Sequence, residues 1–318
     1  MNGPKCSRGR CSVFVAVGLL SLGLCSPAFA YDVDEWDAAT GPADAPGPVP
    51  VLQGVPALDG LLLVGTSTNV NDPTATVNDI FTVDPVTDMS TSVLTATQIW
   101  GATADPANSR VLFTRASGLT PPAGQIGGGD ELMEVPFAGG VPTSIGRITS
   151  PAGGFRVDGL AMSGGVLYGV NAGAGAENGF YSIDLGTLVV TQIALFADSI
   201  SGLDADPDTG IIYGVNDTTA QLVTISLTGT ITNVAAYPVG LTDIDGIAVG
   251  NGFAYLVTDE AGTIPVYDLV GGTYVTPLTS PFTAADTFSG AALASANSEI
   301  FSDGFESGDT LAWSSTVP

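Results

Sequence analysis

The sequence predicts an all-β protein, and three observations lead to this expectation. Only 12% of the 318 residues are charged, 42 are glycine, and Val, Ile, Leu and Thr are abundant. Such a composition is typical of short strands joined by tight turns. No long stretch shows the sustained 3.6-residue periodicity of an amphipathic helix. In addition, a glycine beside apolar residues recurs along the chain, most often every 43 or 44 residues.

The recurring unit begins with this glycine and continues through several strand-like segments. It occurs as QGVPA, WGATA, DGLAM, SGLDA, DGIAV and SGAAL, whose glycines are Gly54, Gly101, Gly159, Gly202, Gly246 and Gly290. The spacings between these glycines are 47, 58, 43, 44 and 44 residues. In each of the first five units a turn leads to a second apolar run, such as VLYGVN or IIYGVN, and then to two more strand-like segments. Each unit therefore predicts four short strands.

Four short strands in about 44 residues are typical of one blade of a β-propeller. A single four-stranded sheet has two apolar faces, which it covers by packing against neighbouring blades around an axis. Five complete units predict five blades, with FSGAALA (288–294) pairing into the first blade to close the ring. VLQGVPA (51–57) is then an extra or edge strand. A sixth blade that begins at EIFS (299–302) is the alternative.

The chain is expected to contain four regions. Residues 1–30 combine basic residues, the apolar run SVFVAVGLLSLGLC and Ala28-Phe29-Ala30, which is the layout of a signal peptide cleaved after Ala30. Residues 31–50 form an acidic, proline-rich linker. Residues 51–298 form the propeller, with a long loop at the insertion 117–130, and residues 299–318 form a C-terminal tail. We therefore expect a secreted or periplasmic protein without a membrane span, because the apolar run of the signal peptide is shorter than the about 20 residues that a membrane helix needs.

Cleavage of the signal peptide leaves a very acidic chain. Four of the 7 basic residues and all 32 acidic residues remain, which gives a formal net charge of −28. The four basic residues are Arg110, Arg115, Arg147 and Arg156. Such a surface repels nucleic acid and anionic lipid. We expect Arg110 and Arg115 to pair with acidic side chains of the chain itself.

The residue inventory excludes most catalytic chemistry. The chain has no histidine, and its only lysine and all three cysteines lie in residues 1–30. Catalysis by a Ser-His-Asp or Cys-His set, Schiff-base chemistry and zinc sites of the His/Cys type are therefore excluded. Asp and Glu remain as acids, bases or calcium ligands. We assign no catalytic residue and no cofactor other than a possible calcium ion.

The residue before each recurring glycine is the best candidate for a site, because the first strand of every blade lines the central channel. These residues are Gln53, Trp100, Asp158, Ser201, Asp245 and Ser289. Asp158 and Asp245, with Asp243 nearby, are expected to hold a calcium ion or to meet a ligand at the channel mouth. Trp100, Ser201 and Ser289 are expected to contact the ligand. DADPDTG (204–210) is interpreted as a strand–turn–strand connector, with a calcium loop as the alternative.

The motifs VLYGVN (166–171), FYSIDLGT (180–187) and IIYGVN (211–216) resemble the LYGV…LYSID…TG repeats of bacterial exported propellers related to the NHL and quinoprotein-like groups. The resemblance covers about residues 51–295. The ending DGFESGD…WS resembles a short tail of many exported bacterial proteins and is interpreted as a disordered acidic end or a recognition tag. The resemblance implies a propeller fold but no activity.

Two functions follow from these expectations. The first is a non-enzymatic exported propeller that binds an extracellular or envelope protein, a glycan or an ion. The alternative is a calcium-dependent hydrolase resembling sugar-lactonase propellers, in which a metal ion held by carboxylates activates water. Asp158 and Asp245 would then be the carboxylates involved.

Overall fold

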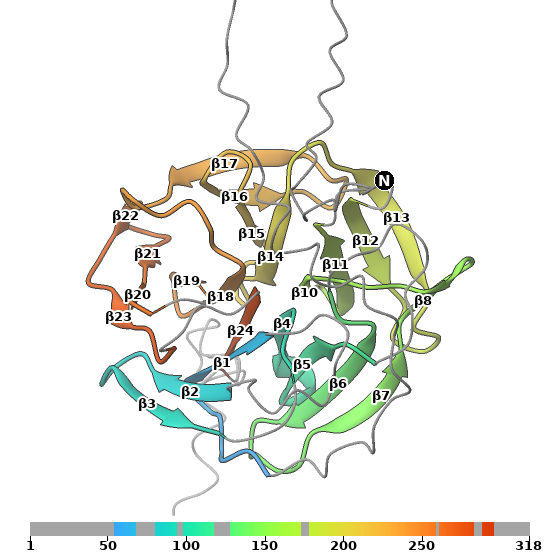
Figure 1. Ribbon diagram of the computed structural model, residues 1–318, viewed down its shortest axis with the longest axis horizontal. Helices are drawn as coiled ribbons and strands as arrows, with labels where there is room; N and C mark the ends of the chain where they lie inside the picture. The colour runs from blue at the N-terminus through green and yellow to red at the C-terminus, as the bar shows by residue number, and fades with distance from the viewer. Residues whose placement is uncertain are drawn as a thin grey trace, which may run out of the picture. The chain divides into compact units, whose positions relative to one another are not determined.

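The computed structural model describes residues 54–67, 80–93, 98–117, 128–172, 178–258, 261–282 and 288–295. The expected signal peptide and linker (1–50) and the tail (299–318) lie outside these residues. The described part forms five four-stranded antiparallel sheets arranged around an axis, which is a five-bladed β-propeller (Figure 1). No helix in the described ranges is long and apolar enough to cross a membrane.

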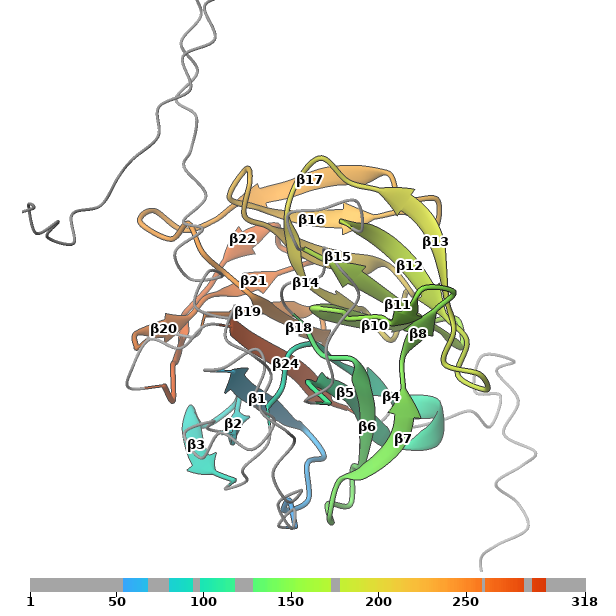
Figure 2. The same cartoon turned by 45° about the vertical axis from the view of Figure 1, so that its right-hand side comes forward.

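Each blade runs outwards from an inner strand that lies near the axis (Figures 1 and 2). Blade 1 contains β24 (Phe288–Ala294), β1 (Leu61–Ser67), β2 (Ile80–Asp84) and β3 (Met89–Ser92). Blade 2 contains β4 (Ala102–Asp105), β5 (Arg110–Arg115), β6 (Glu131–Pro136) and β7 (Thr143–Arg147). Blade 3 contains β10 (Gly159–Ser163), β11 (Val166–Asn171), β12 (Gly179–Ile183) and β13 (Val190–Leu195).

The last two blades follow the same order. Blade 4 contains β14 (Ile200–Ala205), β15 (Ile212–Asn216), β16 (Gln221–Ile225) and β17 (Ile231–Ala236). Blade 5 contains β18 (Gly246–Gly250), β19 (Phe253–Val257), β21 (Val266–Asp268) and β22 (Thr273–Tyr274). Two short hairpins, β8 (Thr149–Ser150) with β9 (Gly153–Gly154) and β20 (Thr263–Ile264) with β23 (Leu278–Thr279), and the 3₁₀ turn η1 (Pro106–Asn108) complete the described elements.

The C-terminal strand closes the ring, as the sequence predicts. β24 pairs antiparallel with β1 over seven residues, from Leu61 opposite Ala294 to Ser67 opposite Phe288. The five blades in the described residues confirm the five-blade prediction, and the segment 299–302 of the six-blade alternative lies outside them. The prediction of an extra or edge strand at 51–57 is wrong for its described part. Val55 forms only an isolated bridge with Gly140, at the turn between β6 and β7 of blade 2.

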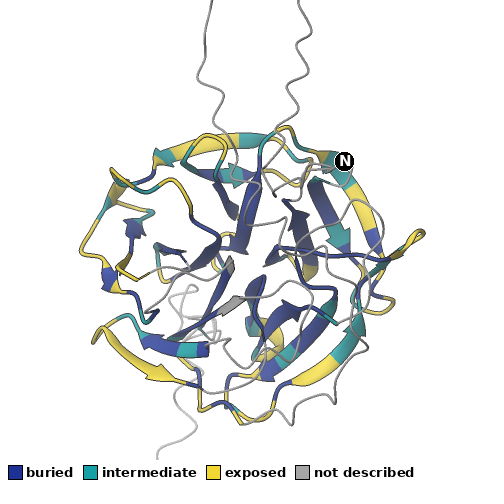
Figure 3. Ribbon diagram, in the orientation of Figure 1, coloured by how far each residue is buried: buried dark blue, intermediate teal, exposed yellow. Residues whose placement is uncertain are grey.

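Five clusters of buried apolar side chains fill the interfaces between neighbouring blades. Successive residues of a strand point to opposite faces, so each strand contributes to two clusters. In β1, Leu62 packs toward blade 5 and Leu63 toward blade 2. Burial therefore concentrates in the inner three strands, while much of the outer strands is exposed (Figure 3).

Five of the six recurring glycines make the close approach of the blades possible. A Cβ atom on Gly101, Gly159, Gly202, Gly246 or Gly290 would collide with or crowd the backbone of the next blade around the ring. The last of them, Gly290, faces Trp100 of blade 2 and so completes the circle. Gly54 is the exception, because its nearest neighbour would be the carbonyl carbon of Gly140 at 3.9 Å. Gly54 therefore matches the sequence motif but does not lie at a close contact between two blades.

Aspartates close several of the tight turns between strands. Asp184 accepts hydrogen bonds from the backbone N–H groups of Gly186 (3.0 Å) and Thr187 (2.7 Å). The side chain of Asp206 does the same for Asp208 in the predicted connector, and Gly210 there has a φ of +71°. The connector is therefore a turn, as predicted. Asp204, however, belongs to β14 rather than to this turn.

Candidate functional site: the channel mouth and the axis

The first candidate site is the channel mouth, which we define as the end of the ring where the inner strands begin. The residues before the recurring glycines lie at this end, at the start of each inner strand. For four of the five residues, the backbone carbonyl oxygen approaches the recurring glycine of the preceding blade. Those residues are Trp100, Asp158, Ser201, Asp245 and Ser289, and all are buried. The structure thus brings them to one end of the ring, whereas Gln53 lies outside the described residues.

The three predicted ligand-binding side chains at the mouth form hydrogen bonds within the protein. The Ser201 hydroxyl donates to Asp217 Oδ2 at 2.6 Å, and the Ser289 hydroxyl donates to the Val257 carbonyl oxygen at 3.0 Å. The indole nitrogen of Trp100 donates to Gln98 Oε1 at 3.1 Å. The three side chains therefore stabilise the protein at the mouth through internal hydrogen bonds. Their contact with a ligand stays a prediction.

Asp158 is the predicted carboxylate with the most unusual environment. It is 1% exposed, and its Oδ2 accepts a hydrogen bond from the Ala172 N–H at 2.6 Å. Its Oδ1 is buried and has no hydrogen-bond partner in the structure. Burial raises the pKa of Asp158 to about 7, although the Ala172 N–H and the positive charge of Arg156 lower it. This carboxyl group therefore keeps its proton to a higher pH than an ordinary aspartate does.

A second carboxylate at the mouth, Asp217, was missed by the sequence reasoning. It follows β15 and accepts hydrogen bonds from Ser201 (2.6 Å), the Tyr237 hydroxyl (3.2 Å) and the Ile244 N–H (3.4 Å). Burial raises its pKa to about 8, and the negative charge of Asp243 adds to that effect. The equivalent position of blade 3 is Ala172, so alignment of VLYGVNA with IIYGVND shows the added carboxylate.

The predicted calcium ligands do not form a compact cluster in the described residues. Asp158 precedes β10 of blade 3, whereas Asp243 and Asp245 precede β18 of blade 5, and blade 4 lies between them. Asp243 is exposed, while Asp245 is buried. Where side chains are described, no three Asp or Glu residues are placed to hold a metal ion together. Calcium binding by Asp158, Asp243 and Asp245 therefore stays a prediction.

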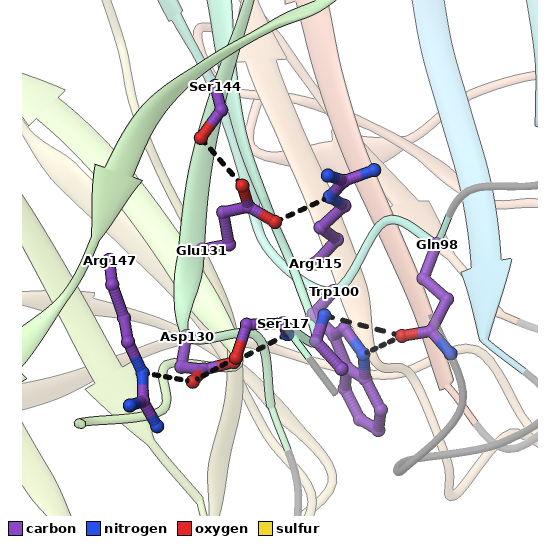
Figure 4. A network of polar contacts seen from close by, with 9 residues as sticks. Gln98, Trp100, Arg115, Ser117, Asp130, Glu131, Ser144 and Arg147 are labelled. Carbon is purple, nitrogen blue, oxygen red and sulfur yellow. Dashed lines mark hydrogen bonds and ion pairs between the residues drawn. The ribbon is translucent and has the colours of Figure 1, made fainter. Parts of the chain in front are cut away.

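The seam between blades 2 and 3, next to the mouth, anchors both ends of the insertion 117–130. Asp130 accepts hydrogen bonds from the Ser117 N–H and hydroxyl, both at 2.7 Å, and pairs with Arg147 Nε at 2.7 Å (Figure 4). Gly129 exchanges two backbone hydrogen bonds with Val157 of the segment that leads into blade 3. Asp130 therefore connects the two described ends of the insertion with each other and with Arg147 of β7.

Arginines gather around this seam. Arg115 pairs with Glu131 at 2.8 Å, and Glu131 also accepts a hydrogen bond from Ser144 at 2.6 Å (Figure 4). Arg156 is fully buried, and this burial lowers the pKa of its guanidinium group. The negative charges of Asp130 and Asp158 partly offset this effect by raising the pKa. At the opposite end of blade 2, Arg110 bridges Asp105 (2.8 Å) and Glu134 (2.6 Å). The prediction that Arg110 and Arg115 pair with acidic side chains is confirmed.

Near the axis, one side-chain hydrogen bond joins two blades that are not neighbours in the ring. The Thr103 hydroxyl of blade 2 donates a hydrogen bond to Asp204 Oδ1 of blade 4 at 2.7 Å. Asp204 also accepts hydrogen bonds from the Ala205 N–H (2.9 Å) and from the Val249 N–H of blade 5 (2.8 Å). Both side chains are almost fully buried. The carboxylate is thus committed to the scaffold rather than exposed to a ligand.

The sequence contained a signal for this contact. Two residues after the recurring glycine, three blades have alanine, namely Ala161, Ala248 and Ala292. Blades 2 and 4 have Thr103 and Asp204 instead. The three alanines belong to the apolar clusters between neighbouring blades, so a polar residue at this buried position needs a hydrogen-bond partner from another blade.

Comparisons with known proteins add little to these observations. No family model matches the chain, and no curated protein matches it. A chain of the nidogen/laminin complex is 12% identical with a TM-score of 0.46, over 74% of this chain and 98% of that one. A protein of unknown function from Bacteroides thetaiotaomicron is 13% identical with a TM-score of 0.47, over 81% and 70%. A hydrazine synthase chain from Kuenenia stuttgartiensis is 14% identical with a TM-score of 0.38, over 57% and 49%. At these values none of them bears on function.

Proposed function

We propose that this chain is an exported, non-enzymatic β-propeller that binds an extracellular or cell-envelope protein or glycan at the channel mouth. One observation carries the proposal: the buried carboxylates of Asp204 and Asp130 are engaged in the scaffold, whereas Asp158 at the mouth keeps a buried oxygen without a hydrogen-bond partner. Asp204 accepts three hydrogen bonds at the axis, and Asp130 holds the base of the insertion. The chain also lacks histidine, so no imidazole base assists them.

The seam of blades 2 and 3 is the part of the mouth that we expect to contact the partner. Binding residues often lie on connecting segments that a scaffold of strands positions, and the described ends of the insertion are held at this seam. Arg147 is 30% exposed at this seam, in a chain whose other charges are overwhelmingly negative. An acidic group of the partner would find few other sites of positive charge on this surface.

The test uses the chain from Tyr31 onward, immobilised and exposed to envelope extracts and to a glycan array. Arg147→Gln removes a charge at the mouth, whereas Arg110→Gln removes one at the opposite end of the same blade. We expect a bound component whose affinity falls at least about tenfold in Arg147→Gln and stays unchanged in Arg110→Gln. Equal affinities for both variants would exclude the seam, and no component retained at micromolar protein would overturn the proposal.

The calcium-dependent hydrolase is tested on the same samples. Calorimetric titration with calcium, and melting with and without a chelator, measure whether a metal ion binds. Heat of binding together with a chelator-sensitive melting temperature that Asp158→Asn abolishes would support the calcium site that the hydrolase requires. Unchanged melting and no heat would exclude it.

A further inference from the structure

The hydrogen bonds at the axis connect four of the five blades through two side chains. Thr103 of blade 2 accepts a hydrogen bond from the Met162 N–H of blade 3 at 3.0 Å and donates one to Asp204 of blade 4. Asp204 in turn accepts the Val249 N–H of blade 5. Blade 1 has Ala292 at the equivalent position and takes no part. The pair Thr103–Asp204 thus connects blades 2 to 5, whereas the closing strand β24 belongs to blade 1.

No positive charge faces Asp204 from the described strands around it. Strands β10, β18 and β24 contain no titratable side chain. On β4, Asp105 is already paired with Arg110, and the neighbouring Asp206 is itself acidic. On β15, Tyr213 lies directly opposite Asp204, and burial raises the pKa of its hydroxyl group. Burial raises the pKa of Asp204 to about 8, although its three hydrogen bonds lower it. An ionised Asp204 is therefore an uncompensated charge at the centre of the ring.

The geometry allows two hydrogen-bond arrangements. When Asp204 is ionised, the Thr103 hydroxyl donates to it. When Asp204 is protonated, its Oδ1 can donate to Thr103 Oγ1, and the Thr103 hydroxyl proton can turn to the Ala104 carbonyl oxygen at 3.4 Å. In both arrangements the N–H groups of Met162 and Val249 keep their acceptors. The protonated form can thus use the hydrogen-bond partners that the structure shows, whereas the ionised form uses them with a negative charge that no cation faces.

We propose that Thr103 and Asp204 form a proton-operated lock on the propeller axis, closed when Asp204 is protonated and weakened when it is ionised. In the closed state the neutral pair holds blades 2 and 4 together. Loss of the proton places an unpaired charge among apolar inner strands, and water must enter the axis to solvate it. The lock is independent of any ligand at the mouth.

The direction of the pH dependence follows from proton linkage. The folded chain holds the Asp204 proton at pH values where the unfolded chain, with an ordinary aspartate pKa, has lost it. The stabilisation is complete in acid, below the unfolded pKa, and is lost as the pH rises through the folded pKa near 8. One such proton lowers the melting temperature by about 3–5 °C for each pH unit in this window.

The main experiment compares melting temperatures of the wild type and Asp204→Asn from pH 4 to pH 9. Asparagine cannot ionise. With its amide oxygen in the place of Oδ2 it keeps the acceptor of the Val249 N–H, and its NH2 group can donate to Thr103 at the loss of the Ala205 acceptor. We expect the wild type to lose about 3–5 °C per pH unit more than the variant between pH 5 and pH 7. Parallel curves would overturn the lock.

Hydrogen exchange tests the conformational part separately. After correction for the intrinsic pH dependence, the Met162 and Val249 amides should lose protection between pH 6 and pH 9 in the wild type and keep it in Asp204→Asn. Equal protection in the two proteins would show that ionisation does not loosen the axis, and would contradict the lock.

A second pair of variants decides the matter if Asp204→Asn does not fold. Thr103→Ser keeps the hydroxyl, and Thr103→Val removes it. Because the Thr103 hydrogen bond lowers the pKa of Asp204, its loss should move the titration of the buried carboxylic acid to higher pH. Infrared spectroscopy of the acid C=O band measures this shift directly. The same midpoint in both variants would overturn the proposal.

Discussion

A Cβ atom on Gly101 would stand 2.8 Å from the carbonyl oxygen of Asp158, on the neighbouring blade. The same relationship links Gly246 of blade 5 to Ser289 of blade 1, at 3.1 Å. The recurring glycine in the sequence therefore reflects a close backbone contact between neighbouring blades rather than a preference of glycine for strands. A glycine recurs because the backbone of one blade occupies the space of a side chain on the blade before it.

Gly101→Ala tests this contact. Because the methyl group meets backbone atoms that cannot move aside, we expect a loss of about 1–3 kcal/mol in the free energy of unfolding. Gly54→Ala is the matched control, since the nearest atom there lies 3.9 Å away, and its effect should stay within about 0.5 kcal/mol. Urea unfolding measures both, and equal effects would contradict the ring of glycines.

Removal of the closing strand should prevent folding, whereas removal of the tail should not. A chain that ends at residue 287 loses β24 and exposes the edge of β1 together with the apolar faces that β24 covers. We expect it to aggregate or to unfold without a cooperative transition. A chain that ends at residue 295 keeps β24 and should melt within about 2 °C of the full chain. Similar melting of both chains would contradict closure by this strand.

Asp158→Asn should stabilise the protein in mild alkali. The amide oxygen keeps the hydrogen bond from Ala172, and the amide removes a buried charge. Since burial raises the pKa of Asp158 to about 7, the wild type loses stability as the pH rises through that value. The melting temperature of the variant should therefore exceed that of the wild type at pH 8.5 and approach it near pH 5. Exposed Asp59→Asn should show no such crossover.

Asp184→Ala should act in the opposite pH direction. Hydrogen bonds from Thr187 and Gly186 lower the pKa of Asp184, so its ionised form stabilises the turn. That contribution is present at neutral pH and is lost as the pH falls through the lowered pKa. We expect the variant to melt a few degrees below the wild type at pH 7 and to approach it in acid. A difference that is constant with pH would exclude the ionised carboxylate as its cause.

The fold could be predicted because both the repeated blades and the closing strand are marked by short sequence motifs. SGAAL near the C-terminus carries the same glycine and alanine as DGLAM and DGIAV, so its pairing into the first blade could be inferred. The motif around Gly54 led to a wrong prediction of a strand at 51–57, because a glycine among apolar residues does not by itself identify a strand of the ring. In the structure its neighbour Val55 meets the β6–β7 turn instead.

The candidate site was predictable only in part. The residues before the glycines could be placed at the mouth, because the inner strands share one direction around the ring. The partner of Asp204 could not be found in the same way, since Thr103 lies 101 residues away and meets it only after the ring has closed. Asp217 was missed because it follows a second strand, whereas the search considered the first strand of each blade.

The central claim is that the C-terminal strand closes a five-bladed ring, and a disulfide across β1 and β24 tests it most directly. The chain from Tyr31 has no cysteine, and Leu61 lies opposite Ala294, at a separation that antiparallel partners share with disulfides. Leu61→Cys with Ala294→Cys should oxidise within the monomer, lose two hydrogens in mass and melt at a higher temperature than the reduced protein. Leu61→Cys with Val234→Cys, on the outer strand of blade 4, should not. Thiols of the first pair that stay reduced, or that link only separate chains, would contradict the closed ring.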